Sequence, residues 1–90
     1  MIRVTEIPGQ LVPVAEGAEY ALLSAEDGAA FVLRFKTDGL SAYLRGDDAT
    51  RFQTDYEAIR DQYPAWLADQ TLAQLWDQGG YGWLAVEDGG

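Results

Sequence analysis

The chain has no cysteine and no histidine, and only one of its six cationic residues is a lysine. Without cysteine it can form no disulfide, thiol nucleophile or thiolate zinc site, and without histidine it lacks the usual imidazole base and metal ligand. A lysine-activated serine would have to use Lys36, and no pattern places that residue beside Ser24 or Ser41. We therefore expect a protein that is not an enzyme and holds no metal or other cofactor.

Long apolar segments are lacking as well. The longest unbroken apolar run is residues 29–33, against the ~20 residues that a membrane-spanning helix needs. Residues 1–6 show no apolar signal-peptide core, and a net charge of -9 opposes binding to anionic lipid surfaces. These features favour a cytoplasmic protein without a membrane partner.

What is present indicates a folded domain. A chain of 90 residues that is 48% hydrophobic can form a single domain, residues 1–90, with one modest core. Strands are expected at residues 18–25, 29–36 and 40–45, and the last two alternate apolar and polar residues. An Asp-Gly pair in each connection is typical of hairpin turns, so the sequence predicts a three-stranded antiparallel meander.

Two helices are expected in the second half of the chain. Apolar residues recur at helical spacing from Phe52 to Tyr63. Asp47 or Asp48 is the predicted N-cap of this helix, because a short carboxylate accepts hydrogen bonds from free backbone N–H groups. Pro64 is expected to end it, since the residue before a proline disfavours helical geometry.

The second helix starts at an ambiguous place. Its apolar stripe ends at Trp76 and does not include Trp66. The stretch is therefore either one helix from Pro64 or a turn followed by a helix capped by Asp69, and we favour the second interpretation. Gly79-Gly80 is expected to end the helix.

These elements together predict an α+β fold. A strand is also expected at residues 2–7, Pro13 keeps residues 11–14 at a sheet edge or in a loop, and residues 81–86 form a closing strand. The order is β-β-β-β-α-α-β. We expect two layers, with a mostly antiparallel sheet of four to five strands and two helices on one of its faces.

Negative charge is concentrated after Arg60. Residues 61–90 contain five acids and no cation, and glutamines recur every four residues along the second helix. A surface of this kind is complementary to a positively charged protein. The expected partner-binding residues are Asp61, Trp66, Asp69, Gln70, Gln74, Asp77, Gln78, Glu87 and Asp88. Reversal of Asp69, Asp77 and Glu87 to lysine is expected to abolish binding and to leave the fold intact.

The cations are expected on the other side of the molecule. Arg34, Lys36 and Arg45 alternate with the apolar residues of their strands and so project from the outward face of the sheet. The domain is therefore predicted to have an acidic helical side and a mildly basic sheet face. The acids equally fit a simple role in solubility, and the strand cations a role in solvating an open sheet.

The charge pattern favours an interaction protein as the function. Nucleic-acid-binding proteins carry broad positive surfaces because they neutralise phosphates. An acidic domain of this size is expected to act as an inhibitor or adaptor on such a surface, for example that of a nuclease. In composition, though by no motif, the chain resembles acidic DNA-mimic proteins, phage anti-CRISPR proteins and nuclease immunity proteins.

Two alternatives remain open. Exposed aromatic residues would favour a homodimer or another small interaction domain; Trp76 and Trp83 are expected in the core, and the position of Trp66 is undecided. The basic sheet face with Tyr43 could instead bind an anionic ligand or single-stranded nucleic acid. Direct binding of duplex DNA is not expected, because the second helix carries no cation.

Overall fold

A computed structural model describes residues 11–25 and 28–87. The elements follow the expected order β-β-β-β-α-α-β, with a short 3-10 helix before the last strand. Their bounds are β1 Leu11–Glu16, β2 Tyr20–Ala25, β3 Ala30–Phe35, β4 Leu40–Arg45, α1 Asp47–Gln62, α2 Ala68–Asp77, the 3-10 helix η1 Tyr81–Leu84 and β5 Ala85–Glu87. The α+β fold is thus confirmed.

The sheet has five strands in the order β1-β2-β3-β4-β5, and every neighbouring pair is antiparallel. The predicted meander is β2-β3-β4 at its centre. The turn between β3 and β4 needs Gly39, whose φ of 65° lies in the left-handed region that a side chain disfavours. The twofold alternation of the strands places Phe31 and Leu33 next to Leu22 and Leu44 on one face of the sheet.

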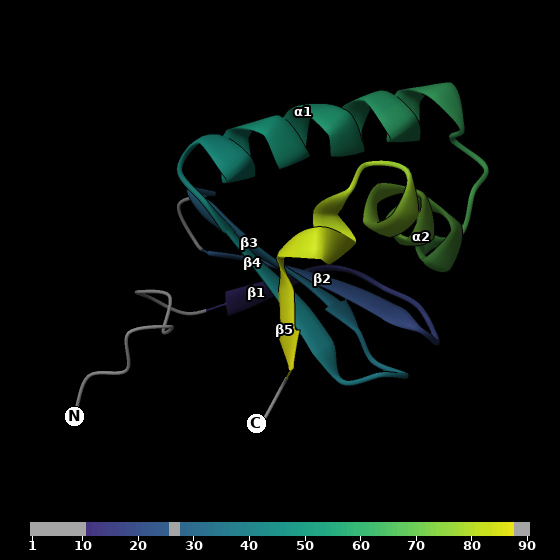
Figure 1. Cartoon of the computed structure of the whole chain (residues 1–90). Helices are drawn as coiled ribbons and strands as arrows, with labels where there is room; N and C mark the ends of the chain where they lie inside the picture. The colour runs from purple at the N-terminus through teal and green to yellow at the C-terminus, as the bar shows by residue number, and fades with distance from the viewer. Residues whose placement is uncertain (1–10, 26–27, 88–90) are drawn as a thin grey trace.

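Both helices cover that same face, as Figure 1 shows. Leu22, Leu33 and Leu44 from the sheet are fully buried against Phe52 of α1 and Leu72 of α2. The domain therefore has the two predicted layers, with the core between the helices and the sheet. Among the described residues, no helix covers the opposite face of the sheet.

The first helix is capped at least one residue earlier than predicted. Its N-cap is Gly46, with φ 61°, so the expectation that Asp47 or Asp48 is the cap was wrong. Both aspartates instead lie in the first turn, where their charge stabilises the positive end of the helix dipole. The C-terminal end is as expected, because α1 stops at Gln62, two residues before Pro64.

The second helix follows a turn, as favoured, and starts at Ala68. Its N-cap is Leu67, so Asp69 is not the cap and that prediction was wrong. The side chain of Gln70 takes over part of the capping, since its Oε1 accepts a hydrogen bond from the Leu67 N–H at 2.9 Å. Gly80, with φ 81°, follows the end of the helix at Asp77.

The last predicted strand differs from expectation, whereas residues 11–14 lie at a sheet edge as Pro13 predicted. Residues 81–86 do not form one strand: η1 occupies Tyr81–Leu84, and only Ala85–Glu87 pairs with β4. The glycine-rich approach to this segment weakens strand formation, while burial of Tyr81 holds the helical turn in place. At the other end, β1 is an edge strand with a register shift between Pro13 and Ala15. The strand predicted at residues 2–7 lies outside the described residues.

Candidate protein-interaction surface

The predicted partner-binding residues that the structure describes are distributed over α1, the turn before α2, α2 and β5. Asp61 lies exposed near the end of α1, and Asp77 and Gln78 lie exposed at the end of α2. Glu87 is exposed in β5 at the sheet edge. Asp88 lies outside the described residues. The remaining members, Trp66, Asp69, Gln70 and Gln74, have roles or surroundings that the sequence did not indicate.

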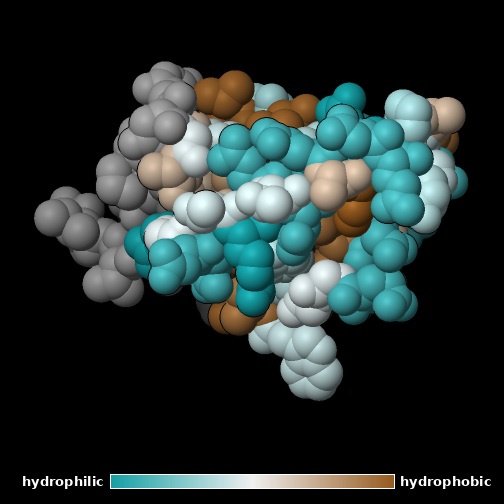
Figure 2. All heavy atoms as spheres, turned by 90° about the horizontal axis from the view of Figure 1, so that it is seen from above, coloured by the Kyte–Doolittle hydropathy of each residue, from teal (hydrophilic) through white to brown (hydrophobic). Residues whose placement is uncertain are grey.

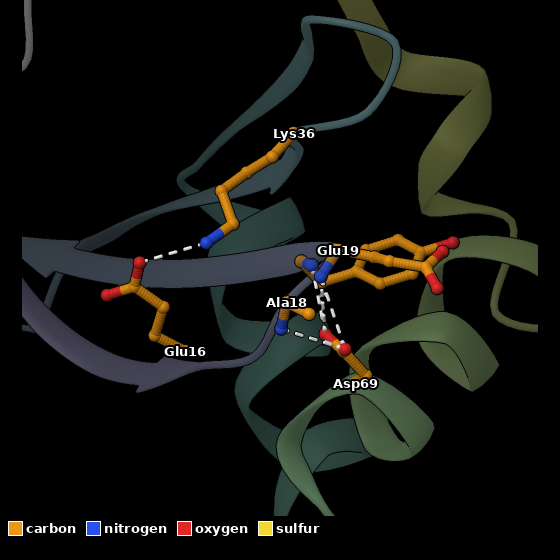
Figure 3. Close-up of polar contacts among 6 residues, drawn as sticks. Glu16, Ala18, Glu19, Lys36 and Asp69 are labelled. Carbon is orange, nitrogen blue, oxygen red and sulfur yellow. Dashed lines mark hydrogen bonds and ion pairs between the residues drawn. The ribbon is translucent and has the colours of Figure 1, made fainter.

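Asp69 binds the chain itself. Its carboxylate accepts hydrogen bonds from the backbone N–H groups of Ala18 at 2.9 Å, Glu19 at 3.1 Å and Tyr20 at 3.0 Å, as drawn in Figure 3. These are charge-assisted bonds, about twice as strong as neutral ones. Asp69 therefore anchors the turn between β1 and β2 to the start of α2. This role within the chain accounts for an acidic residue at position 69 without a partner protein.

The turn is shaped around this carboxylate. A Cβ atom at Gly17 would overlap the Asp69 side chain, so the backbone can approach the carboxylate only because residue 17 is glycine. Nearby, Glu16 of β1 and Lys36, which directly follows β3, form an ion pair of 2.9 Å (Figure 3). Three successive N–H groups at a turn form an anion-binding concavity, and here the anion is supplied by α2.

A groove of about 290 Å³ separates α1 from α2 near the end of α2. Ile59 and Leu75 contribute apolar surface to it, and Asp55, Gln74 and Gln78 contribute polar groups. In Figure 2, which shows the helical layer from above, an apolar strip lies open between hydrophilic residues toward the end of α1. Gln74 and Gln78, two of the predicted partner-binding residues, thus face this groove. The carboxylate of Asp55 lies on its other wall, and the sequence had not indicated that residue.

Asp55 is tied to the core through Tyr81. The Tyr81 hydroxyl donates to Asp55 Oδ2 at 2.8 Å and accepts from Arg51 Nε at 3.2 Å. The Arg51 guanidinium also lies over the Tyr81 ring, 5.1 Å from its centroid. Arg51, one of the two cations of α1, is therefore directed toward the buried phenol of Tyr81.

The three tryptophans lie in three different environments. Trp76 packs against the core beside Tyr20 and Phe35, as expected. Trp66 is half-buried and stacks on Tyr63, with ring centroids 4.0 Å apart. Trp83 is 91% exposed, so its expected place in the core was wrong. The physical reason is the 3-10 turn: in place of strand alternation, it buries Tyr81 and directs Trp83 to solvent.

Two separate hollows include residues from the C-terminal end of α2. Gln78 lines the groove toward α1, and its neighbour Asp77 lines a second hollow together with Trp76, Gly82 and Trp83. An exposed tryptophan beside a carboxylate is the arrangement in this layer that most departs from an ordinary solvated surface. Sequence reasoning missed it because Trp83 was assigned to a strand; the flanking glycines were the available warning.

Burial and neighbouring carboxylates raise the pKa of Tyr20, with Asp77 as the largest charge contribution. Burial also raises the pKa of Tyr81, helped by its hydrogen bond to Asp55 and opposed by Arg51. Both phenols are neutral at pH 7, so their pKa shifts reduce stability only at alkaline pH.

Stability is therefore expected to fall as pH rises above about 10, where unfolded tyrosines begin to ionise. The folded state keeps Tyr20 and Tyr81 protonated to higher pH, so ionisation favours the unfolded chain. Urea midpoints measured between pH 8 and 11.5 should decline over this range, and the double variant Tyr20→Phe, Tyr81→Phe should show a shallower decline. An equal decline in the double variant would contradict this assignment.

The outer sheet face is less basic than its sequence suggested. Lys36 is paired with Glu16, and a hollow of about 310 Å³ on this face is lined by Leu11, Leu23, Val32, Arg34, Ser41 and Tyr43. Apolar residues thus occupy the centre of the surface on which anion binding was considered. This arrangement gives no additional support to that alternative.

Within residues 11–25 and 28–87, no group of acidic side chains is arranged to hold a metal ion. No helix in this part of the chain has the length and apolar character to cross a membrane. Comparisons with protein-family models, with curated proteins and with solved structures found no match to the chain.

Proposed function

We propose that the protein is a non-enzymatic interaction module that docks on a positively charged surface of a partner protein in the cytoplasm. The contact surface is the C-terminal end of α2 with the two hollows beside it. Proteins that bind nucleic acids are the favoured class of partner, because they expose extended cationic surfaces. Occupation of such a surface would make the protein an inhibitor or an adaptor.

The observation that carries this proposal is the charge at the end of α2. A helix C-terminus carries a partial negative charge of about half a unit, which cations in the last turn normally offset. The last turn of α2 contains Asp77 and no basic residue, and the whole chain after Arg60 lacks cations. The helix thus leaves its negative end uncompensated, which costs stability and favours the approach of a positive surface.

The exposed Trp83 supports a contact that is more than electrostatic. Tryptophan is the side chain most enriched among residues that dominate binding energy. Together with the apolar groove between α1 and α2, it supplies contact area that a purely charged DNA-like surface would lack. The proposed module therefore combines charge complementarity with an aromatic anchor.

The test is affinity capture from cells of the source organism, followed by a binding measurement with the purified partner. The double variant Asp77→Asn, Gln78→Lys raises the local charge by two units at exposed positions. We expect it to weaken binding about tenfold at low salt, a change of about 1.4 kcal/mol. Binding of the unmodified protein should also weaken as salt increases.

The matched control is Glu57→Gln, Gln53→Lys, which makes the same chemical changes on α1. Glu57 and Gln53 lie on the side of α1 away from Asp55, since residues two apart are rotated by about 200°. This control should bind like the unmodified protein. Equal affinity for both double variants would contradict the proposal, and so would self-association as the sole interaction found by sedimentation.

A further inference from the structure

The hollow at Trp83 has one fixed wall and one exposed wall. Trp76 is held against the core by Tyr20 and Phe35, with ring centroids 6.0 and 5.6 Å away. Its indole also lies directly over Gly82, where an added Cβ would come within 2.8 Å of Trp76 Nε1. Trp83 projects from η1 next to it, and the hollow between them measures about 220 Å³. Figure 1 places η1 between the end of α2 and the start of β5.

The chemistry of this lining selects a cation. Indole faces attract cations through their negative π surface, and the carboxylate of Asp77 adds a full negative charge. An apolar ligand would strip water from Asp77 without replacing its hydrogen bonds, and an anion would be repelled. The described lining, Trp76, Asp77, Gly82 and Trp83, contributes no positive charge that could already satisfy the carboxylate.

The combination of indole and carboxylate groups in the lining favours a planar cation over a compact one. A guanidinium group stacks flat on an aromatic ring while its N–H groups bond a carboxylate at its edge. An ammonium group is more strongly hydrated and gains less from a ring that faces solvent. Gly82 allows the Trp76 indole to pack directly on the backbone of η1, because a Cβ atom there would come within 2.8 Å of Trp76 Nε1, and this contact fixes the indole as one wall of the hollow.

We propose that this hollow receives an arginine side chain of the partner protein, stacked on Trp83 and paired with Asp77. The inference rests on the proposed function and specifies the residue type that the partner contributes. Trp83 supplies the stacking surface, Asp77 supplies the charge-assisted hydrogen bonds, and Trp76 supplies a rigid wall. The arginine side chain would thereby cover the aromatic residue that is 91% exposed in the free protein.

The test is an NMR titration with end-blocked Gly-Arg-Gly, with end-blocked Gly-Lys-Gly and with the uncharged citrulline analogue. The chain has three tryptophans, so each indole N–H gives its own signal, which single Trp→Phe variants would assign. We expect Gly-Arg-Gly to shift the Trp83 and Trp76 signals with a dissociation constant on the order of millimolar. The lysine peptide should bind at least about threefold more weakly, and citrulline should cause no saturable shift.

Two variants locate the site. Trp83→Ala and Asp77→Asn change exposed side chains, so the fold should persist, and each should weaken binding of the arginine peptide about fivefold. Glu57→Gln removes an equal charge elsewhere and should leave binding unchanged. The Trp66 signal reports on a half-buried ring stacked on Tyr63, away from the hollow, and should not move.

Equal binding of lysine and arginine peptides would overturn the inference, as would equal shifts at Trp66 or unchanged affinity in Trp83→Ala. Each of these results leaves the proposed function open to its own test, because partner capture by the end of α2 is measured separately. Conversely, if partner capture failed while the peptide titration succeeded, the arginine site would stand and the proposed docking on a partner protein would not.

Discussion

Replacement of Tyr81 by alanine is expected to destabilise the domain by about 4 kcal/mol. The side chain is fully buried, packs edge-on against Phe52 at 5.0 Å and bridges Arg51 and Asp55 through its hydroxyl. Removing it leaves a cavity between η1 and α1 and breaks the polar bridge. Since small domains are stable by about 5–15 kcal/mol, this one change should remove a large part of the total.

Urea unfolding monitored by circular dichroism measures this loss, and two further variants divide it. Tyr81→Phe keeps the ring and should cost about 1 kcal/mol, the net value of the hydroxyl hydrogen bonds. Tyr43→Ala removes a tyrosine that is 37% exposed on the outer sheet face and should cost about 1 kcal/mol or less. If Tyr81→Ala were no worse than Tyr43→Ala, Tyr81 would not hold η1 on the core as the packing implies.

Replacement of Asp69 by alanine is expected to cost about 2 kcal/mol. The carboxylate accepts from three successive backbone N–H groups, those of Ala18, Glu19 and Tyr20. Two of these residues are exposed, so water replaces part of what is lost, and the cost stays below that of a fully buried charge pair. Urea midpoints should fall, and the amide protons of these residues should exchange faster.

Gly17 provides the check on this contact. Gly17→Ala should destabilise the protein on its own, because its Cβ would overlap the Asp69 carboxylate. In an Asp69→Ala background most of that penalty should disappear, so a double-mutant cycle should be strongly non-additive. Additive effects would show that the clash and the hydrogen bonds are unrelated. Asp77→Ala, an exposed aspartate on the same helix, should change stability by no more than about 0.5 kcal/mol.

This role changes the charge-reversal experiment that the sequence suggested. Asp69→Lys would place a cation against three N–H donors and would weaken the fold, so lost binding could not be attributed to the surface. Asp77 and Glu87 are exposed and remain suitable positions. The pair Asp77 and Gln78 is preferable, since α1 offers a matched control for it.

Much of the fold could be predicted because it depends on local patterns. Alternation in residues 29–36 and 40–45 and the Asp-Gly turns define β2-β3-β4, and Pro64 ends α1 because of backbone sterics. Helix caps were less predictable. Asp47 was a good cap by propensity, yet Gly46 adopts a positive φ that moves the boundary one residue toward the N-terminus.

The candidate site was less predictable, because its residues are combined by packing. Asp69 and Asp77 are both aspartates of one helix, and only the position of the β1-β2 turn distinguishes a structural anchor from a free carboxylate. The exposure of Trp83 depended on whether residues 81–84 form a strand or a 3-10 helix. Burial of Tyr81 decided in favour of the 3-10 helix. Local propensity gives no information on such long-range competition for space.

The sequence by itself determined that the chain lacks thiol and imidazole chemistry and folds as an α+β meander with two helices. It also determined that every charged side chain after Arg60 is negative. These are properties of composition and local periodicity. The tertiary structure decided where that charge is available. In the folded domain Asp69 is bound to the β1-β2 turn, whereas Asp77 lies at an uncompensated helix end with Trp83 beside it. The physical reason is that contacts between distant segments determine which side chains are hydrogen-bonded within the protein and which face solvent.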